Sequence, residues 1–437
     1  MLYDSAVLPG WDVEMMAKQL EKLLLQIDSG LDPSTVVSDL RPLTHQQAAD
    51  ILKFSCSDLN EHHECLHERI LAKAKDWETN DAVHGWDARY TYSELQSTVK
   101  LLSPRVSSHL GGMAGGRIIP ICYEKSAAAL VAMLTMLSGG YGFLMIDSGL
   151  PTDRIKYMLE VIGANCVVCS NASQQLVLNI GAQSINFENM FQSAAYCIFT
   201  SGSTGSPKGV VLLHNQVTSG LEAQCSVGLY LSSAHILQFS SYSFDTSIAD
   251  IFATLLSGVG CVCIPRDEDK LVQLSRNINE FSVNVIDLTP SAARMIQPAD
   301  VPKLKVLRLG GESMHQHHIE TWANRCNLQN TYSPTECCVQ CTSVDHIDNS
   351  TPSSVIGKGI GCHTWVVDPQ THEHLMPLGA VDELAIQGPA VARDLVKFNK
   401  QGNLIFVGRG DNQIKIRGQR VELEEIENNL QQHALTK

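Results

Sequence analysis

Residues 196–214 constrain this chain more than any other stretch. They form an apolar run, a loop rich in glycine, serine and threonine, and a second apolar run, so the sequence predicts a strand, a loop and a strand. Glycines let the backbone approach an anion closely, the hydroxyl groups add hydrogen-bond donors, and Lys208 adds a point charge. The P-loop consensus is not met, because Gly209 follows Lys208 where that motif needs serine or threonine. We interpret the stretch as a phosphate-binding loop; the alternative is a solvated hairpin loop. The candidate phosphate-binding residues are Thr200, Ser201, Gly202, Ser203, Thr204, Gly205 and Lys208.

Chain length and charge limit the possible classes of function. At 437 residues the chain exceeds the size at which a single core stops growing, so two or three compact units are expected. A net charge of -14 offers no basic surface to nucleic acid or to anionic lipid. The N-terminus lacks the features of a signal peptide, and no apolar run approaches the length of about 18 residues that suggests a membrane span. We therefore expect a cytoplasmic protein with neither a nucleic-acid nor a membrane partner.

Fourteen cysteines are scattered along the chain, mostly within apolar, strand-like runs. This distribution favours buried free thiols over a disulfide framework. Two C-x-x-C spacings occur, at Cys166/Cys169 and Cys338/Cys341, and metal or redox roles are formally open for them. If both pairs lie in strands, residues three apart point to opposite faces, and neither pair is expected to chelate a metal from one side.

Strand and helix patterns alternate along the first third of the chain. Residues 12–27 form an amphipathic helix with Asp12 as its expected N-cap, and Ser93 is the expected N-cap of a later helix. Residues 127–138 make an apolar helix closed by two glycines, and a strand follows at 143–147. This alternation predicts parallel β-α-β units.

Several motifs, taken in order, resemble those of the adenylate-forming (AMP-binding) enzyme superfamily, which includes acyl-CoA ligases, luciferases and the adenylation domains of nonribosomal peptide synthetases. They include residues 196–214, 330–336 and 408–423. Asp245 narrows the resemblance to a fungal-type nonribosomal peptide synthetase adenylation domain, because an aspartate at this place in the family accepts the α-ammonium group of an amino acid. From the residues alone, Asp245 is equally well explained as a helix N-cap.

The resemblance implies roles for individual residues. Tyr332 is expected to stack on adenine, Thr335 to contact the α-phosphate, and Glu336 to hold Mg²⁺ through its carboxylate oxygens. Lys208, Thr335 and Glu336 are thus the expected catalytic residues. Ser333 replaces the family's glycine, which would strain the loop if that position needs a positive φ. The other positions carried over are Gly311, Asp394 and Arg409 for the nucleotide and Asp411 for the hinge.

A pocket for the amino-acid side chain follows from the same register. Asp287 and Arg308 either pair with each other or contact a polar substrate side chain, and the sequence does not name the amino acid. The implied substrate-binding residues are Asp245, Thr246, Ala249, Asp287, Arg308, Gly310, Thr331, Val339 and Gln340.

Two departures from the family pattern affect the expected organisation. A segment that normally follows residues 388–393 is missing, so that Asp394 stands without its usual Thr-Gly approach, and the chain stops before most of the lid and its catalytic lysine. We expect a mostly α-helical linker or condensation-domain remnant at 1–60. We expect an adenylation core at 61–407 with an internal deletion near 393, and a hinge with the start of a truncated lid at 408–437.

The expected fold class is α/β, with two doubly wound αβ subdomains, a small β-rich subdomain and a C-terminal lid that is essentially absent. The expected function is ATP- and Mg²⁺-dependent activation of an amino acid as its aminoacyl-adenylate, for nonribosomal peptide (secondary metabolite) biosynthesis. A carrier (thiolation) domain in cis or in trans is the implied partner. The alternatives are a non-catalytic remnant that binds nucleotide and, disfavoured by Asp245, an acyl-CoA ligase.

Overall fold

The computed structural model describes the greater part of the chain. The described residues are 9–30, 32, 34–35, 40–57, 59–110, 117–170, 172–173, 176, 194–200, 207–228, 230, 234–258, 260–267, 271–368, 374–388, 395–398, 404–408, 413–416 and 419–422. None of the helices in these ranges combines the length and the apolar composition that crossing a membrane requires.

The first sheet has the strand order β5-β3-β4-β6-β7 and is parallel except for β7. Its strands are β3 (Ile118–Cys122), β4 (Gly142–Met145), β5 (Val168–Cys169), β6 (Ala194–Thr200) and β7 (Lys208–Leu213). The helices of this region are α4 (Tyr92–His109), α5 (Ala127–Ser138) and α6 (Thr152–Val161). The helix expected at 127–138 and the strand expected at 143–147 are both present.

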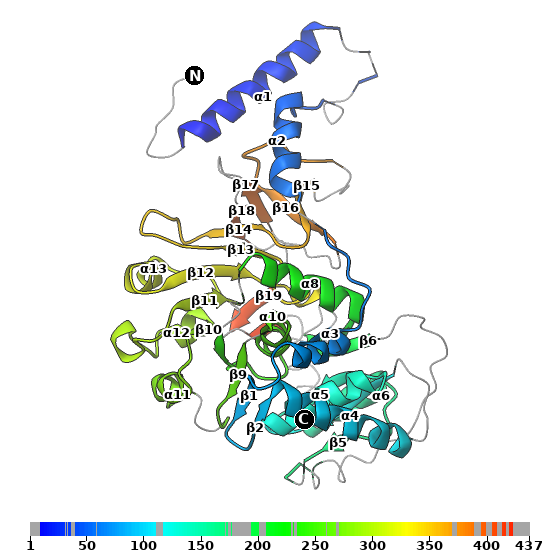
Figure 1. Ribbon diagram of the computed structural model, residues 1–437. Coiled ribbons are helices and arrows are strands. Elements are labelled where there is room, and N and C mark those ends of the chain that lie inside the picture. The colour runs from blue at the N-terminus through cyan, green and yellow to red at the C-terminus, as the bar shows by residue number, and fades with distance from the viewer. Residues whose placement is uncertain are drawn as a thin grey trace, which may run out of the picture.

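The position of helix α5 explains its apolar composition. It contacts β3 and β4 of the first sheet and β1 of the second, and nearly all of its residues are buried (Figure 1). A helix between two sheets has no solvent-facing side, so it is apolar all round rather than amphipathic.

The second sheet contains thirteen strands in the order β15-β16-β17-β18-β14-β13-β12-β11-β10-β8-β9-β1-β2. From β1 to β12 its central strands are parallel. The strands of this half are β1 (Asp81–Gly85), β2 (Arg89–Thr91), β8 (His235–Leu237), β9 (Cys261–Ile264), β10 (Val285–Leu288), β11 (Val306–Gly310) and β12 (Asn327–Tyr332). The associated helices are α3 (Leu66–Ala72), η2 (Lys73–Lys75), α8 (His214–Ser226), α9 (Thr246–Ile248), η3 (Ala249–Ala253), α10 (Thr254–Ser257), α11 (Leu274–Glu280), α12 (Pro290–Ala293), η4 (Pro298–Asp300) and α13 (Gln316–Trp322).

The expected β-rich subdomain is present, but it continues the second sheet. Antiparallel pairing runs from β12 through β13 and β14 to β18, β17, β16 and β15. These strands are β13 (Thr342–Val344), β14 (Val355–Gly359), β15 (His363–Val367), β16 (Asp382–Gln387), β17 (Leu395–Phe398) and β18 (Leu404–Gly408), and the short helix η5 (Thr335–Cys337) precedes them. Strands β16 and β17 flank the expected deletion near 393 and still pair with each other.

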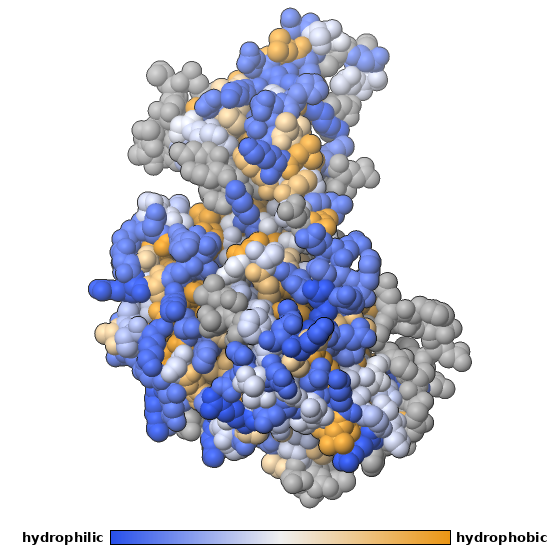
Figure 2. All heavy atoms as spheres, in the orientation of Figure 1, coloured by the Kyte–Doolittle hydropathy of each residue, from blue (hydrophilic) through white to orange (hydrophobic). Residues whose placement is uncertain are grey.

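The N-terminal helices α1 (Gly10–Asp28) and α2 (His45–Ser55) pack on this β-rich part (Figure 1). Met15 and Ile51 enter its core, and Ser57 Oγ donates a 2.7 Å hydrogen bond to the Cys362 carbonyl. Of the apolar residues expected on one side of α1, Val13 is buried, whereas Met16, Leu20, Leu24 and Ile27 are exposed. Figure 2 shows hydrophobic atoms among hydrophilic ones over these helices.

Two N-cap predictions are wrong. Thr91 rather than Ser93 caps α4: Thr91 Oγ1 accepts a hydrogen bond from the Glu94 backbone N–H, and the Glu94 carboxylate accepts one from the Thr91 N–H. Helix α1 begins after Pro9, which leaves Asp12 buried inside the first turn.

Within the motif at 408–423, β19 (Gln413–Ile416) forms a two-stranded antiparallel sheet with β20 (Gln419–Glu422). Arg409 and Asp411, the expected nucleotide and hinge residues, lie outside the described residues.

Candidate functional site

The predicted strand-loop-strand at 196–214 is confirmed as the hairpin β6–β7. Thr200 pairs with Lys208 at the loop end of the hairpin, and helix α8 begins directly after β7. The predicted phosphate-binding residues between them, Ser201, Gly202, Ser203, Thr204 and Gly205, lie outside the described residues. The structure therefore places the two ends of the predicted loop.

The expected nucleotide residues cluster where β11 and β12 end. Gly311 follows β11, Tyr332 is the last residue of β12, and Thr335 and Glu336 are the first two residues of η5, which begins three residues after Tyr332. Strand β7, which begins with Lys208, contacts η5. The three expected catalytic residues thus lie on two adjoining elements, at the carboxyl edge of the parallel strands where ligands bind in open α/β sheets.

The backbone strain lies at a different residue from the one expected. Ser333 has no positive φ, whereas Cys338 has φ 50° and Val339 has φ 73°. For a β-branched residue such as Val339 this conformation is an outlier, and the surrounding structure must hold it in place. Nothing in the local sequence indicates this strain.

Helix α8 supplies part of that support. The Gln224 side chain donates hydrogen bonds of 2.9 Å to the Cys338 carbonyl and 3.1 Å to the Gln340 carbonyl, on either side of Val339. Gly220, one turn earlier, leaves room for the same loop, since a Cβ there would lie 2.7 Å from Cys338 Sγ. The helix that follows the phosphate hairpin therefore fixes the loop that carries two expected substrate residues.

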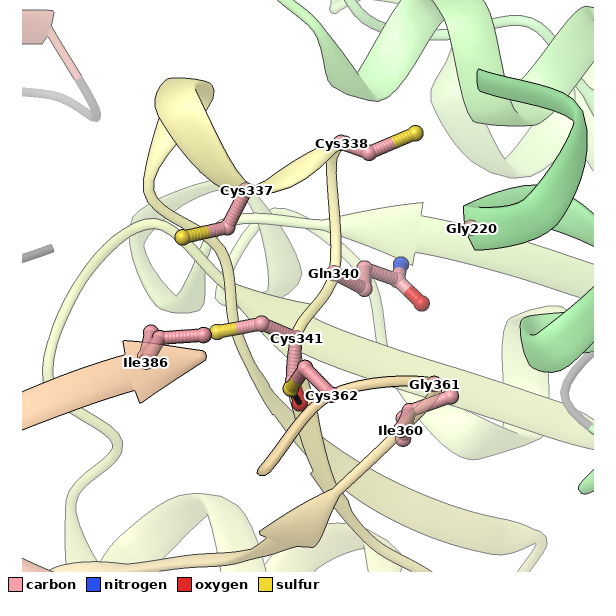
Figure 3. Close-up of a pocket in the computed structure, with 9 residues that line it drawn as sticks. All are labelled: Gly220, Cys337, Cys338, Gln340, Cys341, Ile360, Gly361, Cys362 and Ile386. Atoms are coloured by element: carbon pink, nitrogen blue, oxygen red, sulfur yellow. Dashed lines mark hydrogen bonds between the residues drawn. The ribbon is translucent and has the colours of Figure 1, made fainter. Parts of the chain in front are cut away.

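A small cavity lies against this loop (Figure 3). Figure 3 shows Gly220 on α8 facing Cys338 and Gln340, with three further thiols on the other side. The lining residues are Gly220, Cys337, Cys338, Gln340, Cys341, Ile360, Gly361, Cys362 and Ile386.

The thiols that line this cavity have low reactivity. All fourteen cysteines are free, as expected. Burial raises the pKa of the Cys362 thiol to about 12, and burial raises the pKa of Cys338 further still, which suppresses the reactive thiolate. Cys338 and Cys341 lie in a turn and not in the strand assumed for them. Their sulfurs diverge: Cys338 Sγ points to the Val217 carbonyl, and Cys341 Sγ to the Tyr332 carbonyl.

Asp245 immediately precedes α9 and is only 6% exposed. Its side chain makes no capping hydrogen bond to that helix, which removes the support for the N-cap interpretation. After burial, the negative charge of Asp245 contributes to the raised pKa of Tyr196 and of Cys338, so Asp245 lies near β6 and near the loop of Val339. Thr246 follows it in α9, and Ala249 begins a π-helical turn, a feature frequent at functional sites.

The segment that leads to Asp245 is anchored by a buried lysine that the sequence analysis missed. Lys125 Nζ donates hydrogen bonds of 2.7 Å to the Phe239 carbonyl and 3.3 Å to the Gln238 carbonyl. Ser241 Oγ donates to Asp147 Oδ2 at 3.2 Å. These contacts connect residues 238–241, which lead to Asp245, to residues that follow strands of the first sheet. In the sequence, the sign of this role is a single lysine between an apolar strand and an apolar helix.

Asp287 and Arg308 pair with each other. They are register partners on β10 and β11, and Arg308 donates through Nε to Asp287 Oδ1 and through Nη2 to Oδ2 at 2.8 Å. The guanidinium carbon lies 4.2 Å from the ring centroid of Tyr230. Burial alone would lower the pKa of Arg308, but the charge of Asp287 outweighs it, so the guanidinium stays charged.

Asp250 joins this pair and was not among the expected residues. It is fully buried, and neither carboxylate oxygen has a hydrogen-bond partner among the described residues. Burial, and then the charge of Asp287, raise the pKa of Asp250 well above its ordinary value. This environment favours the protonated form of Asp250, and the charged residues that act on it, Asp287 and Arg308, come from strands β10 and β11, which lie later in the chain.

Two glycines at the end of β11 are required by close approach and by backbone conformation. A Cβ at Gly310 would lie 2.6 Å from Thr331 Oγ1 on the neighbouring strand, and Gly311 has φ 79°. Gly310 and Thr331 are thus brought together as expected. Asp394, the expected ribose ligand, lies outside the described residues.

A glycine- and serine-rich hairpin beside a turn with Thr335 and Glu336, on two parallel sheets extended by antiparallel strands, is the arrangement of the adenylate-forming class. Comparison with known proteins identifies the family. The profile described as "AMP-binding enzyme" matches residues 71–395, so the chain belongs to the AMP-binding enzyme family. The family expected from the sequence is confirmed.

Similar sequences are parts of fungal synthetases. Peramine synthetase ppzA of Metarhizium rileyi is 31% identical over 490 residues, covering 99% of this chain and 17% of the synthetase. Nonribosomal peptide synthetase 4 of Gibberella zeae is 34% identical over 478 residues, covering 95% of this chain and 6% of that protein. The chain therefore spans a small part of the length of these relatives.

Solved structures share the fold. The nonribosomal peptide synthetase FmoA3, in its α-methyl-L-serine-AMP bound form, matches with a TM-score of 0.80 at 18% identity, covering 94% of this chain and 52% of FmoA3. The Vibrio cholerae adenylation domain AlmE, in complex with glycyl-adenosine-5'-phosphate, matches with a TM-score of 0.70 at 20% identity, covering 86% of this chain and 85% of AlmE. The expected α/β fold class of an adenylation domain is confirmed.

Proposed function

We propose that the chain activates an amino acid as its aminoacyl-adenylate. An oxygen of the amino-acid carboxylate attacks the α-phosphorus of ATP, and the bond from that phosphorus to the bridging oxygen of pyrophosphate breaks. One observation carries the proposal. The hairpin with Lys208 touches the turn with Thr335 and Glu336, and the helix after this hairpin is hydrogen-bonded to the loop of Val339 and Gln340. One continuous element borders both the expected nucleotide and the expected amino-acid positions.

Within this proposal, Lys208 and the loop before it hold the phosphates, Tyr332 stacks on adenine, and Thr335 contacts the α-phosphate. The carboxylate of Glu336 supplies the hard oxygen donors that Mg²⁺ prefers. When bound, the ion neutralises charge that develops on the pyrophosphate. These residues act by positioning and by electrostatics, with little covalent work left to the protein.

Asp245 supports an amino acid over an aryl or fatty acid. A carboxylate that is 6% exposed pairs strongly with an ammonium group, and an uncharged competitor would leave it without that stabilisation. The other expected pocket residues then surround the substrate side chain, and the Asp287–Arg308 pair leaves the pocket polar without a net charge of its own.

The wider context is also part of the proposal. We infer that the chain acts in nonribosomal peptide biosynthesis in the cytoplasm and hands its product to a carrier domain in cis or in trans. The proposal keeps the expected domain boundaries and the deletion near 393, and one observation supports an internal deletion. The stretch aligned with the Metarhizium rileyi synthetase is 490 residues long, more than the 437 residues of this chain, so the relative carries residues that this chain lacks.

The test is amino-acid-dependent exchange of pyrophosphate into ATP, run with the proteinogenic amino acids and with aryl and fatty acids. We expect exchange with one or a few amino acids, lost in Lys208→Ala and Glu336→Ala. Asp245→Asn should abolish it while ATP binding persists, and Asp153→Asn, on the surface of α6, is the matched control. ATP binding without any exchange would favour a nucleotide-binding protein without turnover. Exchange with an aryl or fatty acid alone would favour an acyl-CoA ligase.

A further inference from the structure

Three metal-ligating side chains gather on the side of α8 away from the Val339 loop. Cys65 immediately precedes α3, His67 is the second residue of α3, and His214 is the first residue of α8. The Cys65 sulfur and one ring nitrogen of each histidine all lie within 4.8 Å of one another. The two imidazole rings meet edge-on, with centroids 5.5 Å apart.

The hydrogen bonding of the two rings differs. His214 Nδ1 accepts a 3.2 Å hydrogen bond from the Leu66 backbone N–H, so in the neutral ring the proton sits on Nε2. His67 Nδ1 is buried and has no hydrogen-bond partner among the described residues. A buried polar nitrogen in this state is destabilising, and a ligand that uses its lone pair would relieve that cost.

We propose that Cys65, His67 and His214 form a binding site for a divalent transition-metal ion, with Zn²⁺ as its natural occupant. A thiolate and two neutral imidazoles are the soft and borderline ligands that Zn²⁺ prefers over Mg²⁺. At bond lengths of about 2.3 Å to sulfur and about 2.0 Å to nitrogen, tetrahedral ligands stand roughly 3.5 Å apart. The observed separations therefore close with small side-chain rotations. Water takes the fourth position.

Binding of the metal ion releases one proton. The Cys65 thiol loses its proton to solvent when its sulfur binds the metal. His67 binds through Nδ1, and both imidazoles keep their proton on Nε2. His214 also binds through Nδ1, which frees the Leu66 N–H, and the neighbouring metal-bound thiolate is an acceptor for it.

The charge around the cluster favours a cation. The Glu68 carboxylate lies beside the cluster, where it accepts a 3.4 Å hydrogen bond from the Cys65 backbone N–H. A negative charge at this place stabilises a nearby metal ion. A bound ion would link the segment before α3 to the start of α8. Helix α8 follows β7, the strand that begins with Lys208, directly in the chain. The site is separate from Glu336, so it does not depend on the proposed function.

Titration of the chelator-treated full chain with Co²⁺ tests this proposal, because Co²⁺ replaces Zn²⁺ and reports its ligands by absorption. We expect one equivalent to give the d–d bands of a tetrahedral ion and a thiolate-to-cobalt charge-transfer band, and one equivalent of Zn²⁺ to abolish both. Co²⁺ bound at Glu336 has only oxygen ligands and gives no thiolate band. Cys65→Ser, which changes one atom, should remove the charge-transfer band.

Cys56→Ser is the matched control, because Cys56 is an exposed thiol outside the cluster, and it should keep the band. His67→Gln should weaken Co²⁺ binding at least about tenfold, and thermal melts without metal show whether each variant is folded. The proposal is overturned if the wild-type chain gives no thiolate band, if folded Cys65→Ser retains it, or if Cys56→Ser loses it.

Discussion

Arg308 and Asp287 lie opposite each other on neighbouring strands, joined by two hydrogen bonds, with side chains that are 0% and 6% exposed. Such a pair has no access to water, so each charge depends on the other. Both residues are among the expected substrate-binding residues. Removing one or both charges tests whether the two residues stabilise each other.

Arg308→Met should lower the free energy of unfolding by about 3 to 5 kcal/mol, because it leaves the Asp287 carboxylate buried without its partner. Urea unfolding measures this. The double variant Arg308→Met/Asp287→Leu should recover most of the loss, since it removes both charges. A double variant as unstable as Arg308→Met would show that packing, and not the orphaned charge, causes the loss.

Asp250→Asn should change the pH dependence of stability. The pKa of Asp250 is raised in the folded state, so its contribution to stability is complete below the unfolded pKa of about 3.8 and is lost as the pH rises. As the pH rises from about 4 to 7, the wild-type chain should lose stability relative to Asp250→Asn, by at most about 1.4 kcal/mol per pH unit. Unfolding of both chains at each pH gives this difference. A difference that does not vary with pH would mean that Asp250 is ionised in the folded chain.

His214 should act with the opposite sign. Burial, and then the neighbouring His67, lower the pKa of His214 to about 4. The unfolded chain therefore binds more protons between the ordinary pKa of about 6.5 and about 4, and stability falls as the pH drops through this window. Relative to His214→Gln, the wild-type chain should lose at most about 3 kcal/mol across it. The measurement needs a chelator, and His63→Gln, at an exposed position, is the control.

Gln224→Leu tests whether α8 supports the substrate loop. The variant removes both hydrogen bonds that the Gln224 side chain donates on either side of the strained Val339. In the exchange assay the KM for the amino acid should rise about tenfold, which corresponds to about 1.4 kcal/mol, while the KM for ATP changes little. Ser226→Ala, on the exposed end of the same helix, should change neither. An equal rise in both KM values would mean that the whole helix is displaced.

Local patterns predicted much of the fold. The hairpin at 196–214 and the helix at 127–138 were predictable because each carries its own signal, turn-forming residues in the first and a continuous apolar run in the second. The cap of α4 was predictable but missed, since Thr91 and Glu94 have the spacing of a capping box.

The residues that support the site could not be predicted in this way. Gln224 reaches carbonyls more than a hundred residues away in sequence, and Lys125 likewise bonds to carbonyls on another sheet. Asp250 depends on strands β10 and β11, which come later in the chain. Their roles arise from tertiary contacts, and a window of neighbouring residues contains no sign of them.

The hydrogen-bond ladder that runs from β2 through β14 and β18 to β15 determines which parts of the molecule can separate. Breaking the second sheet at any strand exposes a row of amide and carbonyl groups, so its two halves should melt as one cooperative block. No ladder joins this sheet to the five-stranded one in the described residues, where side-chain packing such as that of Phe143 against Phe252 forms the contact. A rigid-body displacement within this part of the chain therefore breaks the fewest backbone hydrogen bonds along the boundary between the two sheets.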